Sequence, residues 1–279
     1  MSSSSVVPRS LVWATELDVL PADRVLVRRH DYLVVRSPGN PTHYWGNLLL
    51  FDEPPAPGDG ARWERAFEAE LGSDPRVRHR TFAWDRVDGA LGAARAEFTG
   101  HGYKVEQSVG LIGTTVELRT HPRANREVAV HPLSPLPGGD DELWRQVVEL
   151  QIAGRDGSVD EAAYRAFITK RLEDLRELFC AGRGCWYVAL GEHHQVLGSC
   201  GVVVTGRRGR FQTVDTAAHA RRRGICSRLV VEAAHRTAER YAVGLFVIVA
   251  DPGYHALGLY ESLGFQRRER VAGVYKAPV

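Results

Sequence analysis

The spacing of hydrophobic and polar residues predicts alternating strands and helices in the first half of the chain. Apolar runs bounded by Gly, Pro and Asp are typical of strands, and they occupy residues 24–36, 44–51, 78–83 and 103–117. Helical spacing between these runs predicts helices over residues 62–71 and 89–98. Trp63, Phe67 and Leu71 share one face of the first of these helices.

The second half begins around a segment rich in Pro and Gly, residues 131–139. Before it, residues 126–130 have a strand pattern, and after it two successive helices are expected over residues 141–152 and 159–178. Strands are then predicted at 186–190, 196–204, 210–216, 243–249 and 265–275, and helices at 223–241 and 254–263. This order implies an α/β fold with a twisted sheet of mixed direction and flanking helices.

A short internal match predicts that this architecture is duplicated. The segment DRVDGALG begins at Asp85 and the segment DPGYHALG at Asp251, and each follows a predicted strand and opens a predicted helix. Aligning the two aspartates superimposes the Ala-Leu-Gly triplets without a gap. Each helix then leads to a similar break, HGY at 101–103 and LGF at 263–265.

Size and charge narrow the possible functions. The chain has 279 residues, 44% of them hydrophobic, which suffices for two domains, and its formal net charge of +2 argues against a dedicated nucleic-acid binder. The longest apolar runs are far below the ~20 residues needed to span a bilayer. Residues 1–9 lack the features of a secretion signal and are expected to be a disordered tail. We therefore expect a cytoplasmic protein with no membrane partner.

The four cysteines are too few for a disulfide scaffold. Cys180 and Cys185 precede His193 and His194 and raise the question of a metal site. The two histidines are adjacent, however, and would point to opposite sides of an extended segment. We interpret the cysteines as reduced packing residues and expect no metal.

The segment VDTAAHARRRGICSRL, residues 214–229, ends a predicted strand and begins a helix. Free N–H groups and a partial positive charge at a helix N-terminus suit a pyrophosphate. Gly224 would allow close approach of the backbone, and Arg221, Arg222 and Arg223 would add charge. No Lys-Ser or Lys-Thr pair follows the glycine, which excludes a nucleotide P-loop. The alternatives are an exposed basic turn or a contact to nucleic-acid backbone.

A second motif, YESLGF from Tyr260 to Phe265, follows one strand later. Together the two motifs resemble the GNAT superfamily of acyl-CoA-dependent N-acyltransferases over residues 126–279. Arg221 and Gly224 match the first two defined places of its Arg/Gln-x-x-Gly-x-Gly/Ala signature. Cys226 stands where Gly or Ala is usual. Gly253 replaces an Asn that contacts the cofactor in many members, so that contact is missing or is supplied by Asp251, Tyr254 or His255.

The resemblance implies acetyl-CoA as co-substrate, bound where two neighbouring strands part. Val214 and Thr216 would offer backbone groups to the pantetheine arm, and residues 222–227 would hold the pyrophosphate. The implied cofactor-binding residues are Val214, Asp215, Thr216, Arg221, Arg222, Arg223, Gly224, Ile225, Cys226, Ser227, Tyr254 and His255. A primary amine of a small molecule or peptide would attack the thioester directly in a ternary complex.

Such attack requires a stabilised leaving thiolate and a neutral amine. Tyr260 matches the family's tyrosine that protonates or hydrogen-bonds the departing sulfur; the alternative is a packing role. A phenol of pKa ~10 facing a thiol of pKa ~8.5 favours hydrogen bonding in the transition state as much as full transfer. The general base stays open between Asp215, His219, His255 and a water chain. Cys226 lies in the pyrophosphate loop, so we do not expect it to act as a nucleophile.

The first half resembles a degenerate GNAT domain that binds no cofactor. The acidic, Pro-containing segment 52–61 stands in place of the arginine–glycine loop, and Ala94 aligns with Tyr260. We therefore expect domains at 10–122 and 123–279, in tandem. The hypothesis is that the first domain completes the fold and walls the acceptor pocket. The polar and aromatic residues to watch are His43, Tyr44, Trp45 and Asn47, although a strand with ordinary buried aromatics is the alternative.

The resulting functional prediction is an N-acetyltransferase, as a monomer or homodimer. A non-catalytic acyl-CoA-binding regulator and a protein-interaction module are the alternatives. The acceptor stays open among aminoglycosides, amino acids, polyamines and protein termini. A pocket for a polycation needs carboxylates, and those available, unless they are solvated helix faces, are Glu64, Glu68, Glu70, Asp140, Asp141 and Glu142.

Overall fold

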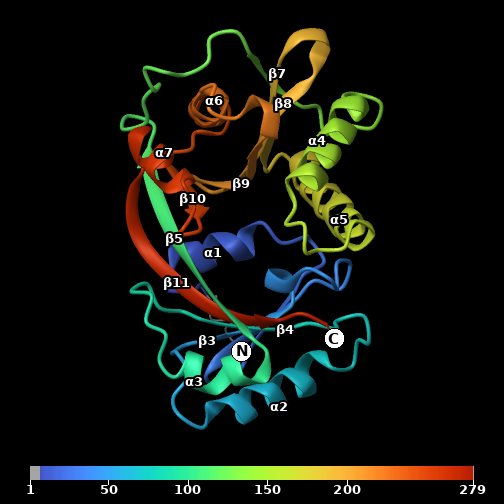
Figure 1. Ribbon diagram of the computed structural model, residues 1–279, viewed down its shortest axis with the longest axis vertical. Coiled ribbons are helices and arrows are strands. Elements are labelled where there is room, and N and C mark those ends of the chain that lie inside the picture. The colour runs from blue at the N-terminus through green and yellow to red at the C-terminus, as the bar shows by residue number, and fades with distance from the viewer. Residues whose placement is uncertain (1–6, 279) are drawn as a thin grey trace. The chain divides into compact units, whose positions relative to one another are not determined.

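The computed structural model describes residues 7–278 and shows an α/β protein with two compact units (Figure 1). The first unit contains Met1–Gly110, Ala250–Pro252 and Arg268–Val279, and the second contains Leu111–Val249 and Gly253–Arg267. These limits differ from the expected division between residues 122 and 123. Two long strands, β5 (Lys104–Thr114) and β11 (Gln266–Lys276), contain unit boundaries.

The first unit is a sheet with helices on both faces. Its strands follow the order β1-β2-β3-β4-β11. Pairs β1/β2 and β2/β3 are antiparallel, β3/β4 is parallel, and β11 is antiparallel to β4. Figure 1 shows α2 and α3 on one face of this sheet and α1 on the other. The elements are α1 (Leu11–Asp18), β1 (Val25–Arg28), β2 (Tyr32–Arg36), η1 (Tyr44–Gly46), β3 (Leu48–Phe51), α2 (Asp59–Leu71), β4 (Arg80–Trp84), α3 (Ala94–Phe98) and η2 (Thr99–His101).

Aromatic side chains fill the core between this sheet and its helices α2 and α3. Trp63, Phe67 and Leu71, which share one face of α2, are all buried. The Trp63 ring stacks on Phe51 with centroids 3.7 Å apart, and Phe82 packs edge-on against Trp63. The amphipathic pattern of α2 therefore positions the helix that follows β3.

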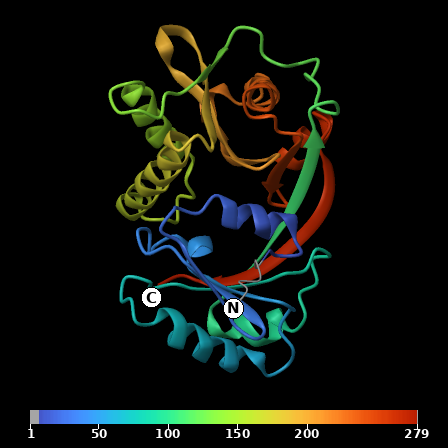
Figure 2. The same ribbon diagram turned by 180° about the vertical axis from the view of Figure 1, so that it is seen from behind.

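The second unit has the strand order β5-β10-β9-β8-β7-β6. Helices α4 and α5 cover one face of its sheet and α6 covers the other, as both views show (Figures 1 and 2). The elements are β6 (Ala129–Pro132), α4 (Asp141–Gly154), α5 (Glu161–Cys180), β7 (Gly184–Leu190), η3 (Glu192–His194), β8 (Val196–Thr205), β9 (Arg208–Thr216), η4 (Ala218–Ala220), α6 (Ile225–Tyr241), β10 (Leu245–Ala250) and α7 (Ala256–Ser262).

The two units contain the same series of elements. In β1-β2-β3-α2-β4-α3-β5 and in β7-β8-β9-α6-β10-α7-β11, three antiparallel strands lead through a helix to a parallel strand, a short helix and a last strand. The last strands are exchanged, because β11 lies beside β4 and β5 lies beside β10. The predicted duplication is therefore present in the fold.

Some local predictions differ from the structure. Residues 24–36 form two strands joined by a turn in which Arg29 N–H donates to Tyr32 O, and residues 44–46 form a 3-10 turn instead of a strand. The aligned Ala-Leu-Gly triplets also differ, because residues 256–258 begin α7 whereas residues 90–92 form a loop before α3. Gly89 and Gly92 have φ of +73° and +52°, which a right-handed helix does not accept.

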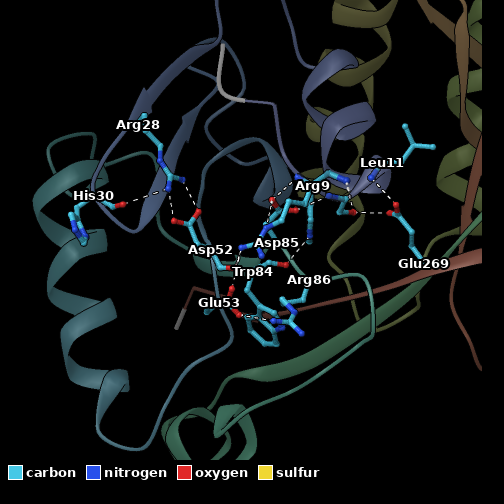
Figure 3. Close-up of polar contacts among 12 residues, drawn as sticks. Arg9, Leu11, Arg28, His30, Asp52, Glu53, Trp84, Asp85, Arg86 and Glu269 are labelled. Atoms are coloured by element: carbon cyan, nitrogen blue, oxygen red, sulfur yellow. Dashed lines mark hydrogen bonds and ion pairs between the residues drawn. The ribbon is translucent and has the colours of Figure 1, made fainter. Parts of the chain in front are cut away.

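The end of the expected N-terminal tail is ordered. Residues 1–6 lie outside the described residues, but Arg9 N–H donates to Asp85 (2.6 Å) and its guanidinium reaches Glu53 at 3.1 Å (Figure 3). Asp85 and Glu269 also accept hydrogen bonds from backbone N–H groups of residues 10–12. These two carboxylates therefore cap α1, a helix that the hydrophobic pattern did not predict.

The cysteines are all free, and Cys185 and Cys200 are buried whereas Cys180 is exposed. Residues 193 and 194 lie in the short 3-10 turn η3, not in an extended segment. Within residues 7–278, no group of three or more His, Cys, Asp or Glu side chains is arranged to hold a metal ion. In the same part of the chain, no helix combines the length and apolarity needed to cross a bilayer.

Candidate active site

Strands β9 and β10 pair over only part of their length. β9 pairs with β10 over only three residues, from Arg208↔Leu245 to Arg210↔Val247, although β9 continues to Thr216. On its other edge, β9 pairs with β8 up to Thr216. The described part of β9 beyond Arg210 therefore has one edge without a strand partner. This is the opening that the family resemblance implies.

A β-bulge lies at this opening. The register with β8 runs from Gln212↔Gly201 to Asp215↔Ser199, so β9 carries an extra residue opposite Cys200. Thr213 has φ of +48°, which is unusual for a β-branched residue. A bulge bends its strand and leaves a residue out of the ladder. The bulge therefore breaks the regular pairing immediately before Val214 and Asp215.

The loop after β9 leads into the N-terminus of α6. Gly224 is the N-cap residue, with φ of +73°, and no side chain caps the helix. Within residues 7–278, no acceptor contacts the N–H groups of Gly224, Ile225, Cys226 or Ser227. A helix of 17 residues thus presents free donors and the positive end of its dipole at this point.

The three arginines of this loop are exposed but differ in their contacts. Arg221 donates from Nε to the carbonyl of Thr216 (3.2 Å), and Arg223 forms an ion pair with Glu127 at 3.6 Å. Arg222 has φ of +61° and no ion-pair partner in the described part of the chain. Arg222 therefore holds an uncompensated charge beside the free N–H groups of α6.

Gly224 also contacts residues 117–127, a segment that we call the strap. A Cβ on Gly224 would overlap the carbonyl of Arg123 and would lie 2.8 Å from the backbone nitrogen of Asn125. Asn125 donates from its backbone N–H to Gly224 O and from Nδ2 to Arg223 O, both at 3.0 Å. The sequence suggested that phosphate approach explains this glycine. The structure adds a second reason, since the strap leaves no room for a side chain, and no local motif indicated it.

Tyr260 is buried on α7. Its ring packs edge-on against Phe265 with centroids 6.2 Å apart, and its hydroxyl has no hydrogen-bond partner among residues 7–278. Burial, followed by the nearby Cys226 thiol, raises the pKa of Tyr260 well above its usual value. The phenol is therefore neutral and able to donate. Gly264, in the same motif, has φ of +104°, and a Cβ there would overlap the strap carbonyl of Glu117.

A cavity of about 340 Å³ lies between α4, the start of β8 and the end of β9. Asp215 borders it, with Oδ1 accepting from the Thr216 N–H (2.7 Å), whereas Oδ2 has no hydrogen-bond partner among the described residues. Burial raises the pKa of Asp215. The cavity is lined by Arg145, Gln146, Glu149, Leu150, Ala153, Gly154, Gln195, Val196, Asp215, Thr216, Ala217, Ala218, His219 and Arg221.

The other candidate bases have different environments. His219 borders the same cavity but is exposed, and His255 is exposed beside Tyr254 at the start of α7, with ring centroids 4.1 Å apart. Burial and the Asp215 carboxylate raise the pKa of Cys226 to about 12, so its thiol stays protonated. Both backbone groups of Thr216, one of the two expected pantetheine contacts, have protein partners: its N–H donates to Asp215 and its carbonyl accepts from Arg221.

The residues singled out in the first half are engaged within the first unit. Asn47 donates to the carbonyls of Asn40 and His43 and accepts from Ser37 N–H. Tyr44 stacks on His79 and Trp45 packs on Trp13. The six carboxylates considered for a polycation each have a partner in the protein: Glu64, Glu68, Glu70, Asp140, Asp141 and Glu142.

Comparisons with known proteins identify a family for one segment of the second unit. Residues 182–267 match the family model described as an acetyltransferase (GNAT) domain. A search of curated proteins finds no match for the sequence. The matched segment contains β8, β9, α6, β10 and α7, which together form the opening, the loop and the buried tyrosine. The second unit therefore carries an acetyltransferase domain. That domain is a member of the GNAT family.

Three solved structures share the fold over nearly the whole chain. A functionally unknown conserved protein from Staphylococcus epidermidis has a TM-score of 0.71 at 14% identity, covering 92% of this chain and 95% of that one. A GCN5-related N-acetyltransferase from Kribbella flavida has a TM-score of 0.65 at 14% identity, covering 96% and 95%. A tandem GNAT protein from the clavulanic acid biosynthesis pathway has a TM-score of 0.56 at 15% identity, covering 98% and 91%. The two-unit fold is therefore similar to that of tandem GNAT proteins.

Proposed function

We propose that the second unit binds acetyl-CoA and transfers its acetyl group to a primary amine of a small molecule or peptide. The observation that carries this proposal is the parting of β9 from β10 beside the free N-terminus of α6. The unpaired strand edge offers backbone groups to a pantetheine arm, and the N–H groups with Arg222 offer a site for pyrophosphate. In the first unit, the equivalent strands β3 and β4 pair to their last residues.

The chemistry follows from the positions of Tyr260 and Asp215. The amine nitrogen attacks the thioester carbonyl, so that a C–N bond forms and the C–S bond breaks. The Tyr260 hydroxyl donates a hydrogen bond to the departing sulfur, which needs it most as negative charge develops there. The amine loses one proton, and Asp215 is the group that we assign to accept it.

Asp215 is preferred over the histidines because of its burial. Asp215 is half-buried, and a carboxylate whose pKa is raised by desolvation binds a proton more readily than a fully exposed one. Its Oδ2 has no hydrogen-bond donor among residues 7–278. His219 could act only from the exposed rim of the cavity, and His255 lies outside the cavity lining. The cavity of about 340 Å³ would then admit the acceptor amine.

The first experiment measures acetyl-CoA binding by calorimetry and turnover against a panel of primary amines. Tyr260→Phe keeps the ring that packs on Phe265 and removes only a hydroxyl without a partner in the described chain. We expect unchanged acetyl-CoA affinity and thermal stability, with turnover reduced about 10²-fold or more.

Two charge-reversal variants test where the pyrophosphate binds. Arg222→Glu reverses a charge beside α6, and Arg207→Glu makes the same change in the hairpin before β9, at the opposite end of that strand. Only the first should weaken acetyl-CoA binding, by about tenfold or more. Absence of binding by the parent protein would end the proposal. Binding without turnover on any amine would favour the non-catalytic regulator instead.

A further inference from the structure

The strap, residues 117–127, lies outside the segment matched by the family model but contacts both ends of the proposed cofactor site. At one end, Arg119 N–H donates to Leu263 O (2.9 Å), which closes the motif containing Tyr260. At the other end, Asn125 binds the pyrophosphate loop at Arg223 and Gly224. Both contacts lie within the second unit.

Asn125 fixes the strap firmly against the loop. Its Nδ2 donates to Arg223 O, while its Oδ1 accepts from the backbone N–H groups of Glu127 and Val128, both at 2.9 Å. The side-chain amide is thus occupied by protein groups and is not available to a ligand. Glu127 in turn pairs with Arg223. The residues next to Asn125 in the strap are therefore held beside the α6 N-terminus.

Those neighbouring residues carry uncompensated positive charge. Arg123 and Arg126 are exposed, and neither has an ion-pair partner in the part of the chain that the structure describes. The Arg123 carbonyl contacts Gly224, so its guanidinium starts from backbone that touches the pyrophosphate loop. Arg222 adds a third unpaired charge from the loop itself. Two segments nearly a hundred residues apart thus carry exposed arginines on stretches of backbone that meet at Gly224.

Acetyl-CoA carries two separate anionic groups that such arginines could bind. The pyrophosphate suits the free N–H groups of α6 and Arg222. The phosphate on the 3′ oxygen of the ribose is a dianionic group at a different place, which these N–H groups do not also serve. Guanidinium groups on long side chains bind such a phosphate through paired charge-assisted hydrogen bonds.

We propose that Arg123 and Arg126 of the strap bind the 3′-phosphate of acetyl-CoA, so that the enzyme selects coenzyme A over dephospho-coenzyme A. This inference rests on the proposed function, because it assumes that the pyrophosphate binds at α6. It adds a specificity element that the acetyltransferase motif of residues 182–267 does not contain.

The test compares acetyl-CoA with acetyl-dephospho-CoA, which differ only in the 3′-phosphate. Calorimetry is performed on the parent, on the Arg123→Gln/Arg126→Gln double variant, and on Arg207→Gln as a control for the loss of an exposed arginine. We expect the parent and the control to bind acetyl-CoA about tenfold or more tightly than acetyl-dephospho-CoA, with a smaller preference at high salt. The double variant should lose this preference.

The affinity for acetyl-dephospho-CoA separates a direct contact from a structural role. If the arginines bind the 3′-phosphate, the double variant binds acetyl-dephospho-CoA as the parent does. A loss of affinity for both ligands would mean that the strap only shapes the loop, and the inference would be wrong. Equal affinity of the parent for both ligands would overturn the inference but leave the proposed function intact. Binding of neither ligand by the parent would overturn both.

Discussion

The parallel strand pair β3/β4 of the first unit and its equivalent in the second unit, β9/β10, differ in how far their pairing extends. In the first unit, β3 and β4 pair to their last residues, Phe51↔Trp84, and Asp85 N–H extends the ladder by donating to Phe51 O (2.8 Å). In the second unit, β9 and β10 part after Arg210↔Val247. The same topology therefore gives a closed sheet in one copy and an open edge in the other.

The helices that follow β3 and β9 also differ, in whether the N–H groups at their N-termini have acceptors. Gly58 begins α2 and Gly224 begins α6, and both have positive φ, +89° and +73°. At α2, however, the Glu97 carboxylate accepts hydrogen bonds from Gly58 and Gly60 N–H at 2.8 and 3.1 Å. A carboxylate of the protein occupies the donors that α6 leaves free. The described part of the first unit thus has neither the open strand edge nor the free helix N–H groups on which the proposed cofactor site of the second unit depends.

The largest expected effect concerns Asp215, at the open edge. Asp215→Asn should lower kcat/KM by about 10²-fold or more, because an amide does not accept the proton. Burial raises the pKa of Asp215, so the parent should lose activity as pH falls through a value above the ~3.9 of an exposed aspartate. A pH–rate profile with the best amine of the panel measures both effects.

Asp52 provides the matched control for this substitution. It follows β3 in the first unit and pairs with Arg28, so Asp52→Asn should leave turnover and its pH profile unchanged. If the pH–rate profile of Asp215→Asn still fell at acid pH as that of the parent does, another group would be the base. Asp215 would then only line the cavity.

The second prediction compares the two glycines that begin the helices. Gly58→Ala should cost about 1–2 kcal/mol from its positive φ alone, because nothing surrounds the added Cβ within 4 Å. Gly224→Ala carries the same conformational penalty plus overlap with Arg123, and should cost about 1–3 kcal/mol more. Denaturant unfolding of the two variants measures the difference. Equal costs would show that the strap does not press on the loop.

Local patterns predicted most of the elements and the two motifs, but neither helix α1 nor the contacts that complete the motifs. Helix α2 and the position of Tyr260 follow from residue spacing within a few turns of chain. The exchange of β5 and β11 leaves no local signal, because both strands have the same hydrophobic pattern. The contact of Asn125 with Gly224 and the cap that Glu269 gives α1 join residues about a hundred or more positions apart. Short-range patterns in a single sequence do not predict contacts between residues so far apart.

The third prediction concerns how Asp215 is positioned. Gly154 ends α4, and a Cβ there would lie 2.7 Å from Asp215 Oδ2. Gly154→Ala should displace the carboxylate and lower kcat/KM by about tenfold, with a shift of the acid limb, while acetyl-CoA binding is kept. Gly157→Ala, where the added methyl meets open space, is the control. If Gly154→Ala kept the pH profile of the parent, the position of the Asp215 carboxylate would not control activity.

The smallest expected effect tests the anion that closes α2. Hydrogen bonds from Gly58 and Gly60 N–H lower the pKa of Glu97. Because its pKa is lowered in the folded protein, the ionised Glu97 carboxylate stabilises the fold at any pH above ~4.3, the pKa of an unfolded Glu. This stabilisation is lost as the pH falls through the lower pKa of the folded state. Glu97→Gln should therefore lower the melting temperature slightly at pH 7, and the difference from the parent should disappear in acid.

Measuring the melting temperatures of the parent and Glu97→Gln from pH 7 down to about 3 distinguishes charge from shape. Glutamine keeps the size of the side chain and one carbonyl acceptor, so packing should change little. A difference that persists unchanged in acid would mean that Glu97 acts through packing, and that no internal anion is needed at α2. A difference that vanishes in acid would support the comparison with α6, where the same kind of donors have no acceptor in the described chain and are proposed to bind phosphate.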